Sequence, residues 1–428
     1  MSNVTHFPRS VRPVTDPLGF YIRPEYRDHR ALLDFFSSGD AAISGVVFNP
    51  TYITQHAELL DLVLDRRIEA ILDTKTAEAS TPGGYTDKLG LLPWGQKRQF
   101  VEEDFSGTKG FRFISSISAF ASDSGFTQVM APTHYISDMT SPWLDIDIRN
   151  TLELRNQLIK RSDKKIALIY PLNIPYSLLK NDVERSSLID KLKVIPADML
   201  WLRIDKLGSD ATATKTCNYI NAASDFHLLG MPIIADQIGG TPGLALLAFG
   251  TVGGLSHGIT LRERFDTSHW HKPRNGGGRI PPRRIYVPEL DLMLKAPQAE
   301  KLFEKDSRFR SLLGCKDKTC CQRGINDTIN NPVRHFLYQR AKQIVALDNM
   351  PETLRPRNYL DKILMPITDR IVKASSRDID DQELMNKLQK HRLRLDAIRT
   401  ALGDQIENNP PKSYSLHPKT RAAREAQG

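Results

Sequence analysis

The chain contains no apolar run near the length of about 20 residues that a membrane-spanning helix needs. Its mean hydropathy is −0.37, and residues 1–13 lack the apolar core of a secretory signal. We therefore expect no membrane association and a cytoplasmic location. Only four of the 428 residues are cysteine, which excludes a disulfide framework.

The remaining composition is that of a folded protein. Hydrophobic residues make up 40% and charged residues 25% of the chain, so disorder throughout is excluded. The length suits one large domain or two ordinary ones. The formal net charge of +9 favours a polyanionic partner, although a mildly basic enzyme without such a partner fits the same charge.

Short aliphatic runs alternate with helix-compatible segments over residues 1–260, which predicts a parallel sheet. Seven such runs occur, and either Gly19–Ile22 or Phe111–Ile114 supplies an eighth. Eight strands in about 250 residues favour an α/β fold of the (β/α)8 TIM-barrel type, and an open doubly wound sheet is the alternative. The seven runs are Ile43–Phe48, Ile68–Leu72, Thr127–Ala131, Ile166–Tyr170, Met199–Ile204, Met231–Ala235 and Thr251–Leu255.

Nearly every predicted strand ends in groups that ionise or form hydrogen bonds. Barrel enzymes assemble their sites from such strand ends, although polar loops alone would give a similar pattern. We predict catalytic roles for four of these residues: Asp73, Asp205, Asp236 and His257. Cationic and amide side chains, together with exposed backbone N–H groups of glycine-rich turns, would bind substrate or its phosphate: Lys75, His134, Asn173, Arg203, Gly239, Gly240, Gly253 and Gly254.

Residues 261–300 form a basic region. The segment from Leu261 to Arg284 contains seven basic and two acidic residues, a net charge of +5. Glycine and proline favour an exposed loop here, and Trp270 offers a stacking surface, so the region suits an RNA or DNA backbone. The predicted nucleic-acid-binding residues are Arg274, Arg279, Arg283 and Arg284. A solvated linker is the alternative.

Three of the four cysteines lie close together in residues 301–375. Cys315, Cys320 and Cys321 are followed by His335, and Cys3His is one of the ligand sets of structural zinc. We therefore predict a small zinc module after the barrel, with buried reduced thiols as the alternative. Adjacent cysteines strain a single tetrahedron, so one of the two need not bind the metal.

Residues 376–407 predict an amphipathic helix that docks on the barrel or on a second copy of the chain, which would give a homodimer. Its apolar stripe consists of Leu384, Leu388, Leu395, Ile398 and Leu402. Residues 408–428 are basic and rich in proline and polar residues, and we expect them to be disordered.

Three segments resemble the tRNA-guanine transglycosylase superfamily. IIADQIGGTPGLALLAFGTVGGLSHG at 233–258 is similar to that family's strand, glycine-threonine-proline turn, helix and last strand; YLDKILMPI follows the cysteine cluster, and SDSGFTQV lies at 122–129. The resemblance implies a barrel with a structural zinc module that exchanges or transfers a base on tRNA or DNA. Where that family ends its last strand in a nucleophilic aspartate, this chain has Ser256 or His257.

Two functional classes follow from these patterns. The first is a barrel enzyme that acts on a nucleic acid or a nucleotide, and the second is a non-catalytic nucleic-acid-binding or assembly scaffold. A small-molecule metabolic enzyme is disfavoured only by the basic segments. Convergence of Asp236 and His257 in one open pocket would favour the enzyme, whereas separation, or ion pairs to neighbours, would favour the scaffold.

Overall fold

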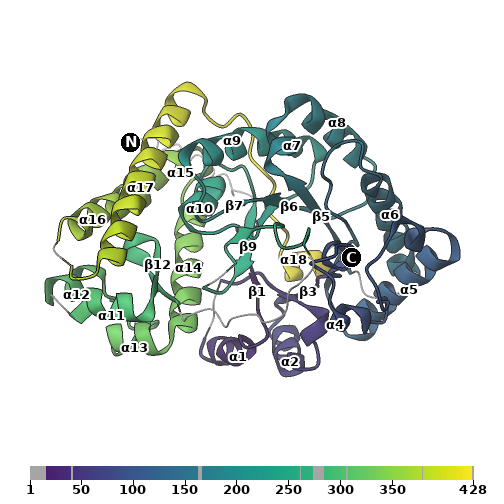
Figure 1. Ribbon diagram of the computed structural model, residues 1–428, viewed down its shortest axis with the longest axis horizontal. Helices are drawn as coiled ribbons and strands as arrows, with labels where there is room; N and C mark the ends of the chain where they lie inside the picture. Colours follow the sequence, from purple (N-terminus) through teal and green to yellow (C-terminus); the bar gives the residue numbers. More distant parts are fainter. Residues whose placement is uncertain are drawn as a thin grey trace, which may run out of the picture.

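The computed structural model describes residues 16–39, 42–161, 166–260, 262–272, 284–304, 307–377 and 379–426. Eight parallel strands close into a barrel at its centre (Figure 1). Their order is β1 (Gly19–Arg23), β2 (Gly45–Phe48), β3 (Glu69–Leu72), β4 (Gln128–Met130), β5 (Ala167–Pro175), β6 (Met199–Asp205), β8 (Ile233–Asp236) and β9 (Gly254–Gly258).

This topology confirms the predicted (β/α)8 barrel. Each of the seven predicted runs overlaps a barrel strand, and the eighth strand is β1, whose Gly19–Arg23 pair in register with Gly254–Gly258 of β9. Phe111–Ile114 lies instead in the helix Gly107–Asp123, with Phe113 and Ile114 buried on one side. The spacing of its apolar residues follows the period of a helix rather than the two-residue period of a strand.

Helices surround the barrel, and further helices follow it in the sequence. No helix in the described residues is long and apolar enough to cross a membrane. The helices of the barrel region are α1 (His29–Ser37), α2 (Ala57–Asp65), α3 (Thr76–Ala79), α4 (Asp87–Gly90), α5 (Gly107–Asp123), α6 (Trp143–Arg161), α7 (Tyr176–Lys180), α8 (Asp182–Leu192), α9 (Ala213–Ala223) and α10 (Gly240–Ala248).

The chain beyond the barrel forms two small antiparallel pairings and further helices. β10 (Arg264–Phe265) pairs with β7 (Leu207–Gly208), and β11 (Arg284–Val287) pairs with β12 (Leu292–Lys295). The helices here are α11 (Ala296–Glu304), α12 (Ser307–Leu313), α13 (Ile325–Asn330), α14 (Pro332–Asp348), α15 (Arg355–Tyr359), α16 (Met365–Ser375), α17 (Gln382–Asn408) and α18 (Arg421–Ala426).

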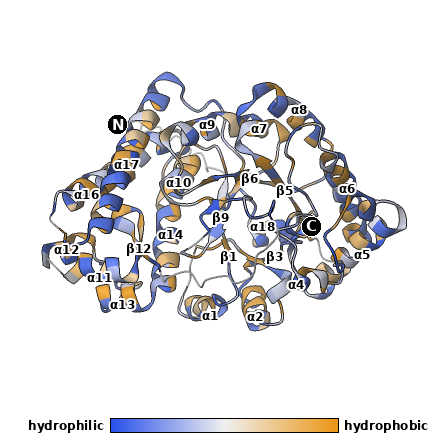
Figure 2. Cartoon of the chain, in the orientation of Figure 1, coloured by the Kyte–Doolittle hydropathy of each residue, from blue (hydrophilic) through white to orange (hydrophobic). Residues whose placement is uncertain are grey.

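The strands separate an inner core from an outer one. Inside the barrel lie Tyr21, Val47, Ile71, Met130, Ile169, Met199, Trp201 and Ile234. The alternate residues of the strands face the surrounding helices. α1 and α2 each carry both apolar and polar residues in Figure 2, whereas every residue of α10 is buried. Apolar packing therefore fills the barrel, and polar groups collect at its ends.

The amphipathic helix α17 packs on this chain. All five residues of its predicted apolar stripe are fully buried, and the helix contacts α9 and α16. His391 on the same face meets the carbonyl of Leu290 through Nε2 at 2.7 Å. A homodimer through α17 stays a prediction, and it would have to use the other faces of the helix.

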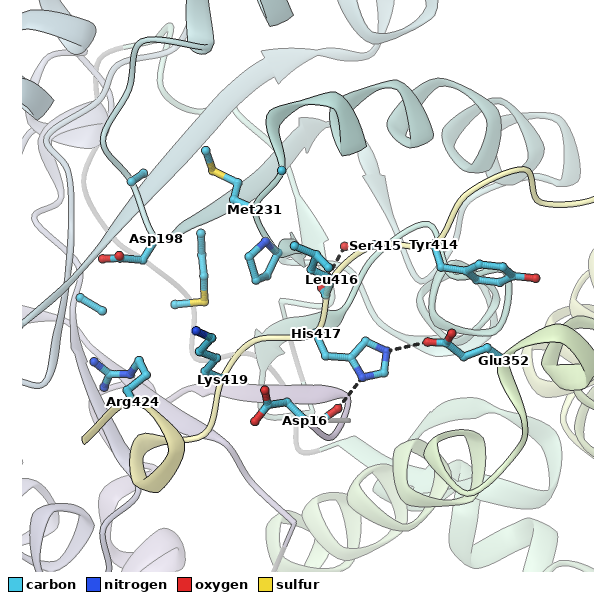
Figure 3. Close-up of a pocket in the computed structure, with 15 residues that line it drawn as sticks. Asp16, Asp198, Met231, Glu352, Tyr414, Ser415, Leu416, His417, Lys419 and Arg424 are labelled. Carbon is cyan, nitrogen blue, oxygen red and sulfur yellow. Dashed lines mark hydrogen bonds and ion pairs between the residues drawn. The ribbon is translucent and has the colours of Figure 1, made fainter. Parts of the chain in front are cut away.

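The C-terminal segment crosses the N-terminal end of the barrel (Figure 3). Ser415 Oγ accepts a hydrogen bond from the N–H of Ile233 at 3.1 Å, His417 contacts the Asp16 carbonyl and Glu352, and Arg424 forms a bidentate ion pair with Glu69. The expectation of a disordered tail is therefore wrong for residues 413–426, because buried partners far away in sequence hold them. A cavity of about 680 Å³ lies beneath the segment.

Candidate functional site

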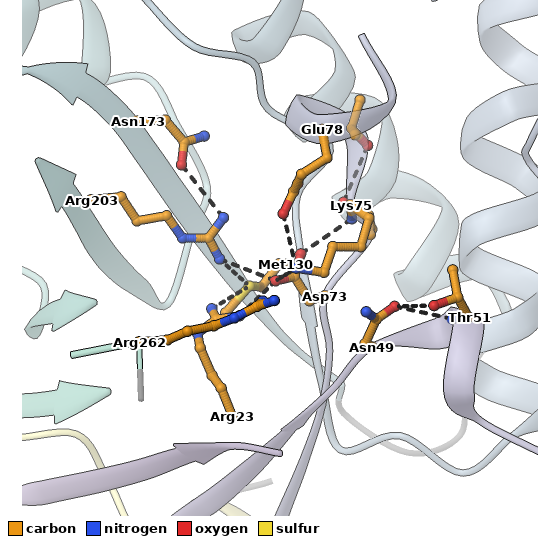
Figure 4. Close-up of polar contacts among 12 residues, drawn as sticks. Arg23, Asn49, Thr51, Asp73, Lys75, Glu78, Met130, Asn173, Arg203 and Arg262 are labelled. Atoms are coloured by element: carbon orange, nitrogen blue, oxygen red, sulfur yellow. Dashed lines mark hydrogen bonds and ion pairs between the residues drawn. The ribbon is translucent and has the colours of Figure 1, made fainter. Parts of the chain in front are cut away.

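Charged and amide side chains from six barrel strands converge at the C-terminal end of the barrel (Figure 4). On four strands these residues continue the inward-facing series, because Tyr21 is followed two residues later by Arg23, Ile71 by Asp73, Trp201 by Arg203 and Ile234 by Asp236. Side chains two residues apart on a strand face the same side. The strand direction then brings all four to the same end.

Arg23, Asp73, Arg203 and Asp236 form a closed salt-bridge ring. Arg23 Nη1 lies 2.6 Å from Asp73 Oδ2, and Arg23 Nη2 lies 2.6 Å from Asp236 Oδ2. Arg203 completes the ring, with Nε 2.6 Å from Asp236 Oδ2 and Nη2 3.3 Å from Asp73 Oδ2. Each carboxylate therefore contacts both guanidinium groups.

Burial and ion pairing oppose each other in this ring. Burial alone raises the pKa of Asp73, but Lys75, Arg203 and Arg23 outweigh it, and the pKa lies well below its usual range. The pKa of Asp236 is also raised by burial and lowered more strongly by Arg23 and Arg203. Both carboxylates are consequently ionised at neutral pH.

Lys75 connects the ring to the adjoining cleft. Its backbone is in the left-handed region, with φ 57°, and its N–H donates to Asp73 Oδ1 at 3.1 Å. Nζ lies 2.9 Å from Glu78 Oε1 and 3.4 Å from Asp73 Oδ2. Burial lowers the pKa of Lys75, and Asp73 and Glu78 more than compensate, so the pKa is raised. The side chain is a fixed positive charge.

A cleft of about 860 Å³ opens beside Lys75 and Glu78. Its walls come from the loops after β2, β3, β8 and β9. Glu78 Oε2 is buried and has no hydrogen-bond partner in the described residues. Gln237, at φ 59°, and Arg262 also line the cleft. The arrangement places one carboxylate oxygen without a hydrogen-bond partner beside an ammonium group that can hold an anion.

The sequence prediction did not include Arg23, Glu78, Gln237 or Arg262 among the residues that bind substrate. Arg23 is the last residue of β1, in the segment YIRPE, and the usual strand-end pattern would have revealed it once β1 was chosen as the eighth strand. Glu78 carries no such signal, because it lies on the short helix α3 and reaches the cleft only through the turn at Lys75.

His134 and Asn173, two predicted substrate-binding residues, lie below the cleft in a buried network. His134 Nδ1 lies 2.6 Å from Asp147 Oδ1, and its ring stacks on Trp143 with centroids 3.9 Å apart. Asn173 donates to the His134 carbonyl at 3.2 Å, and its Oδ1 lies 3.4 Å from Arg203 Nη1. Asn173 therefore contacts the salt-bridge ring through Arg203, and His134 contacts Asn173; neither residue lines the cleft.

Asp205 and His257 do not join the ring. Asp205 Oδ1 accepts a hydrogen bond from the N–H of Thr267 at 2.7 Å. His257 pairs in register with the outward-facing Ile22, so its ring lies between the barrel and α14, 5.7 Å from the ring of Phe336. Burial lowers the pKa of His257. Asp236 and His257 are thus separated by the wall of the barrel.

The predicted glycines occupy two different ends of the barrel. Gly239 is the N-cap of α10 and Gly240 its first residue, beside the site, but the N–H of Thr241 there donates to Asp291 Oδ2 at 2.5 Å. Gly253 and Gly254 lie at the start of β9, at the N-terminal end, where a Cβ on Gly253 would meet the Leu416 carbonyl at 2.1 Å. Gly253 and Gly254 therefore lie at the opposite end of the barrel from the cleft, because Gly253 precedes β9 and Gly254 is its first residue.

The basic loop is described only at its edges. Arg274, Arg279 and Arg283 lie outside the described residues, and Arg284 begins β11 opposite Lys295. Trp270 is 3% exposed and packs against Phe265, with ring centroids 5.5 Å apart. The expectation that Trp270 offers a stacking surface is wrong, because the tryptophan fills a small apolar cluster.

The predicted Cys3His residues form a compact cluster. The ligand atoms of Cys315, Cys320, Cys321 and His335 all lie within 4.8 Å of one another. His335 Nδ1 is 3.3 Å from the sulfur atoms of both Cys320 and Cys321. Its Nε2 lies 3.1 Å from the Tyr286 carbonyl, which is the second hydrogen bond that usually orients a metal-bound imidazole. The distances are compatible with a zinc ion bound by all four residues.

No protein-family model and no curated protein matches the chain. Similar solved structures include a 3-dehydroquinate dehydratase from Enterococcus faecalis, with 11% identity over 58% of this chain and 91% of that chain and a TM-score of 0.34. A GH10 xylanase from Bispora sp. MEY-1 has 11% identity, coverages of 56% and 83% and a TM-score of 0.36. A GH18 chitinase from Pseudoalteromonas aurantia has 12% identity, coverages of 57% and 93% and a TM-score of 0.34.

Proposed function

We propose that the chain is a barrel enzyme that acts on a nucleotide, free or within a nucleic acid, bound in the cleft at the C-terminal end of the barrel. The observation that carries this proposal is the position of Lys75, which contacts Asp73 of the ring and lines the cleft. Buried charges reduce stability unless they are paired, and their concentration at the end where barrel enzymes place their sites favours catalysis.

In this proposal the ring is the rigid base of the site. Arg23 and Arg203 keep Asp73 and Asp236 ionised, and Asp73 orients Lys75. Lys75 binds a phosphate or another substrate anion as a point charge. Glu78 lines the cleft, and one of its oxygens is buried without a hydrogen-bond partner. In this proposal it accepts a proton from the substrate or from an attacking group that reaches it.

The reaction that the family resemblance favours is base exchange. A carboxylate oxygen would form a bond to C1′ of the ribose while the C1′–N bond breaks and the base leaves, and an incoming base would then displace the carboxylate. Asp236 accepts hydrogen bonds at both oxygens. To act as the nucleophile, it would have to exchange an arginine contact for the substrate.

Replacing Lys75 by Met tests the proposal. Hydrogen bonds to charged groups contribute about 1.5–3 kcal/mol, so we expect the affinity for ribose 5-phosphate, measured by calorimetry, to fall about tenfold or more. We also expect slower incorporation of labelled guanine into tRNA. Lys191→Met, which removes a surface ion pair with Asp145, is the matched control and should change neither quantity. Equal affinity in both variants would contradict the proposal.

A non-catalytic nucleic-acid-binding scaffold is the second candidate. It is favoured by the engagement of both Asp236 oxygens with arginine and by the separation of Asp236 from His257. In this case the basic loop would bind the nucleic-acid backbone.

The scaffold candidate predicts a strong effect of the basic loop on binding. Replacing Arg274, Arg279, Arg283 and Arg284 together should weaken the binding of a tRNA and reduce the slope of log K against log salt by up to about 3, since each phosphate contact contributes about 0.7–0.9 to that slope. An unchanged slope would remove the loop from the interface.

We also propose that the Cys3His cluster holds one structural zinc ion. All four ligand positions are filled by protein side chains, as in structural rather than catalytic zinc sites. The ion would join the loop around Cys320 to α14, because His335 lies on that helix.

A further inference from the structure

Two tyrosines and a lysine form an aromatic rim at the mouth of the cleft. The ring centroids of Tyr26 and Tyr52 are 5.4 Å apart at 70°. Lys88 Nζ lies 5.6 Å from the first centroid and 5.7 Å from the second. Tyr52 and Lys88 line the cleft, and Tyr26 is 46% exposed. An aromatic pair with one exposed and one half-buried ring beside a polar cleft points to a ligand.

Contacts with Asn49 and the buried His56 hold the two tyrosine rings in place. Asn49 Oδ1 accepts a hydrogen bond from the N–H of Thr51 at 3.1 Å, capping the short 3-10 helix η1 (Pro50–Tyr52). Tyr52 contacts the ring of His56, with centroids 5.9 Å apart. His56 Nε2 in turn meets the Tyr26 carbonyl at 3.4 Å. Binding at these rings would therefore cost little conformational entropy.

The cleft beside this rim also carries cationic side chains. Arg262 Nη1 forms an ion pair with Glu25, the residue before Tyr26, at 2.7 Å, and Arg262 lines the cleft together with Lys75. The ammonium group of Lys88 occupies the ring faces that a planar ligand would take. Lys88 is an exposed side chain on a flexible stem, so its rotation would free the rings.

We propose that Tyr26 and Tyr52 form a stacking site for the base of a nucleotide whose phosphate is bound by Lys75. This inference rests on the proposed function and names its substrate class more closely. A planar base can stack on the two tyrosines while its phosphate binds Lys75 in the cleft. Stacking on aromatic side chains tolerates different bases. The cleft, at about 860 Å³, lies within the range of small-ligand sites.

The test compares AMP with ribose 5-phosphate, which lacks the base, by calorimetry on the full chain. Stacking contributes about 1–3 kcal/mol per base, so wild type should bind AMP about tenfold more tightly than ribose 5-phosphate. Tyr26→Leu and Tyr52→Leu should each weaken AMP binding severalfold to tenfold and leave ribose 5-phosphate unchanged. Tyr26→Phe, which keeps the ring, should retain the AMP affinity.

Tyr338→Leu is the matched control. Tyr338 also has a cation over its ring, Arg334 at 5.3 Å, but it packs against Phe35 rather than lining the cleft. Equal affinities of wild type for AMP and ribose 5-phosphate would overturn the stacking site and leave the proposed function standing. Loss of AMP affinity in Tyr26→Phe equal to that in Tyr26→Leu would also overturn it. Failure of wild type to bind either compound would instead contradict the proposed function.

Discussion

Replacing Arg203 by Leu is expected to lower the free energy of unfolding by about 3–5 kcal/mol, the usual cost of breaking a buried ion pair on one side. Arg203 is 2% exposed and contacts both carboxylates of the ring. The substitution leaves Asp236 with Arg23 alone in a region that excludes water. The measurement is urea unfolding followed by circular dichroism, with the change read from the transition midpoint.

The double variant Arg203→Leu/Asp236→Leu shows whether the unpaired charge of Asp236 causes the loss of stability in Arg203→Leu. Removing both partners restores neutrality and leaves Arg23 paired with Asp73, so we expect the double variant to be more stable than Arg203→Leu. A double variant that is less stable by the sum of the two single effects would contradict a coupled ring. Lys191→Leu, at the exposed pair with Asp145, should change stability little.

Removal of the proposed zinc ion is the second large expected effect. A site that binds zinc only in the folded state stabilises the fold by about 4 kcal/mol when free zinc exceeds the dissociation constant a thousandfold. We expect one zinc ion per chain by elemental analysis, and a lower thermal midpoint after chelation. Cys321→Ser should lose the ion and show the same lower midpoint without chelator.

Cys217→Ser is the control for that experiment, because Cys217 is a half-buried cysteine on α9, far in sequence from the cluster. It should keep both the zinc ion and the midpoint. A full zinc content in Cys321→Ser would show that Cys321 is not a ligand, and absence of zinc from wild type would contradict the site. The second result would favour the alternative of reduced buried thiols.

We also expect zinc removal to affect the barrel, because a series of hydrogen bonds joins His335 to the start of α10. His335 bonds to the carbonyl of Tyr286, and the Tyr286 hydroxyl donates to Asp291 Oδ1 at 2.9 Å. Asp291 Oδ2 in turn accepts hydrogen bonds from the backbone and hydroxyl of Thr241 at the start of α10. The Cys3His cluster is thereby linked by hydrogen bonds to the glycine-rich turn beside the candidate site.

The sequence pattern predicted the strands correctly because each is a short apolar run bounded by polar or glycine residues. It left the eighth strand undecided, since Gly19–Ile22 and Phe111–Ile114 are both short and apolar. Closure of the barrel through β1 and β9 resolved that choice. The same closure gave Arg23 its place in the site.

The errors came from features that a linear pattern does not contain. His257 was grouped with Asp236 because both end strands, but the two-residue alternation directs one outward and the other inward. Gly253 was predicted to bind substrate from a glycine-rich turn, but it precedes β9 at the opposite end of the barrel from the cleft. Residues 413–426 were expected to be disordered from composition, although Ser415 and Arg424 bond to residues more than 180 positions away.

The sequence by itself determined the alternation of parallel strands and helices, the cysteine cluster and the set of polar residues at the strand ends, because these follow from local periodicity and short spacings. Only the tertiary structure decided which charges meet. Arg23 and Asp236 are 213 positions apart and lie 2.6 Å from each other, a contact fixed by strand order and barrel closure. Burial then makes their pairing obligatory, since an isolated charge inside the barrel would be far less stable than the pair.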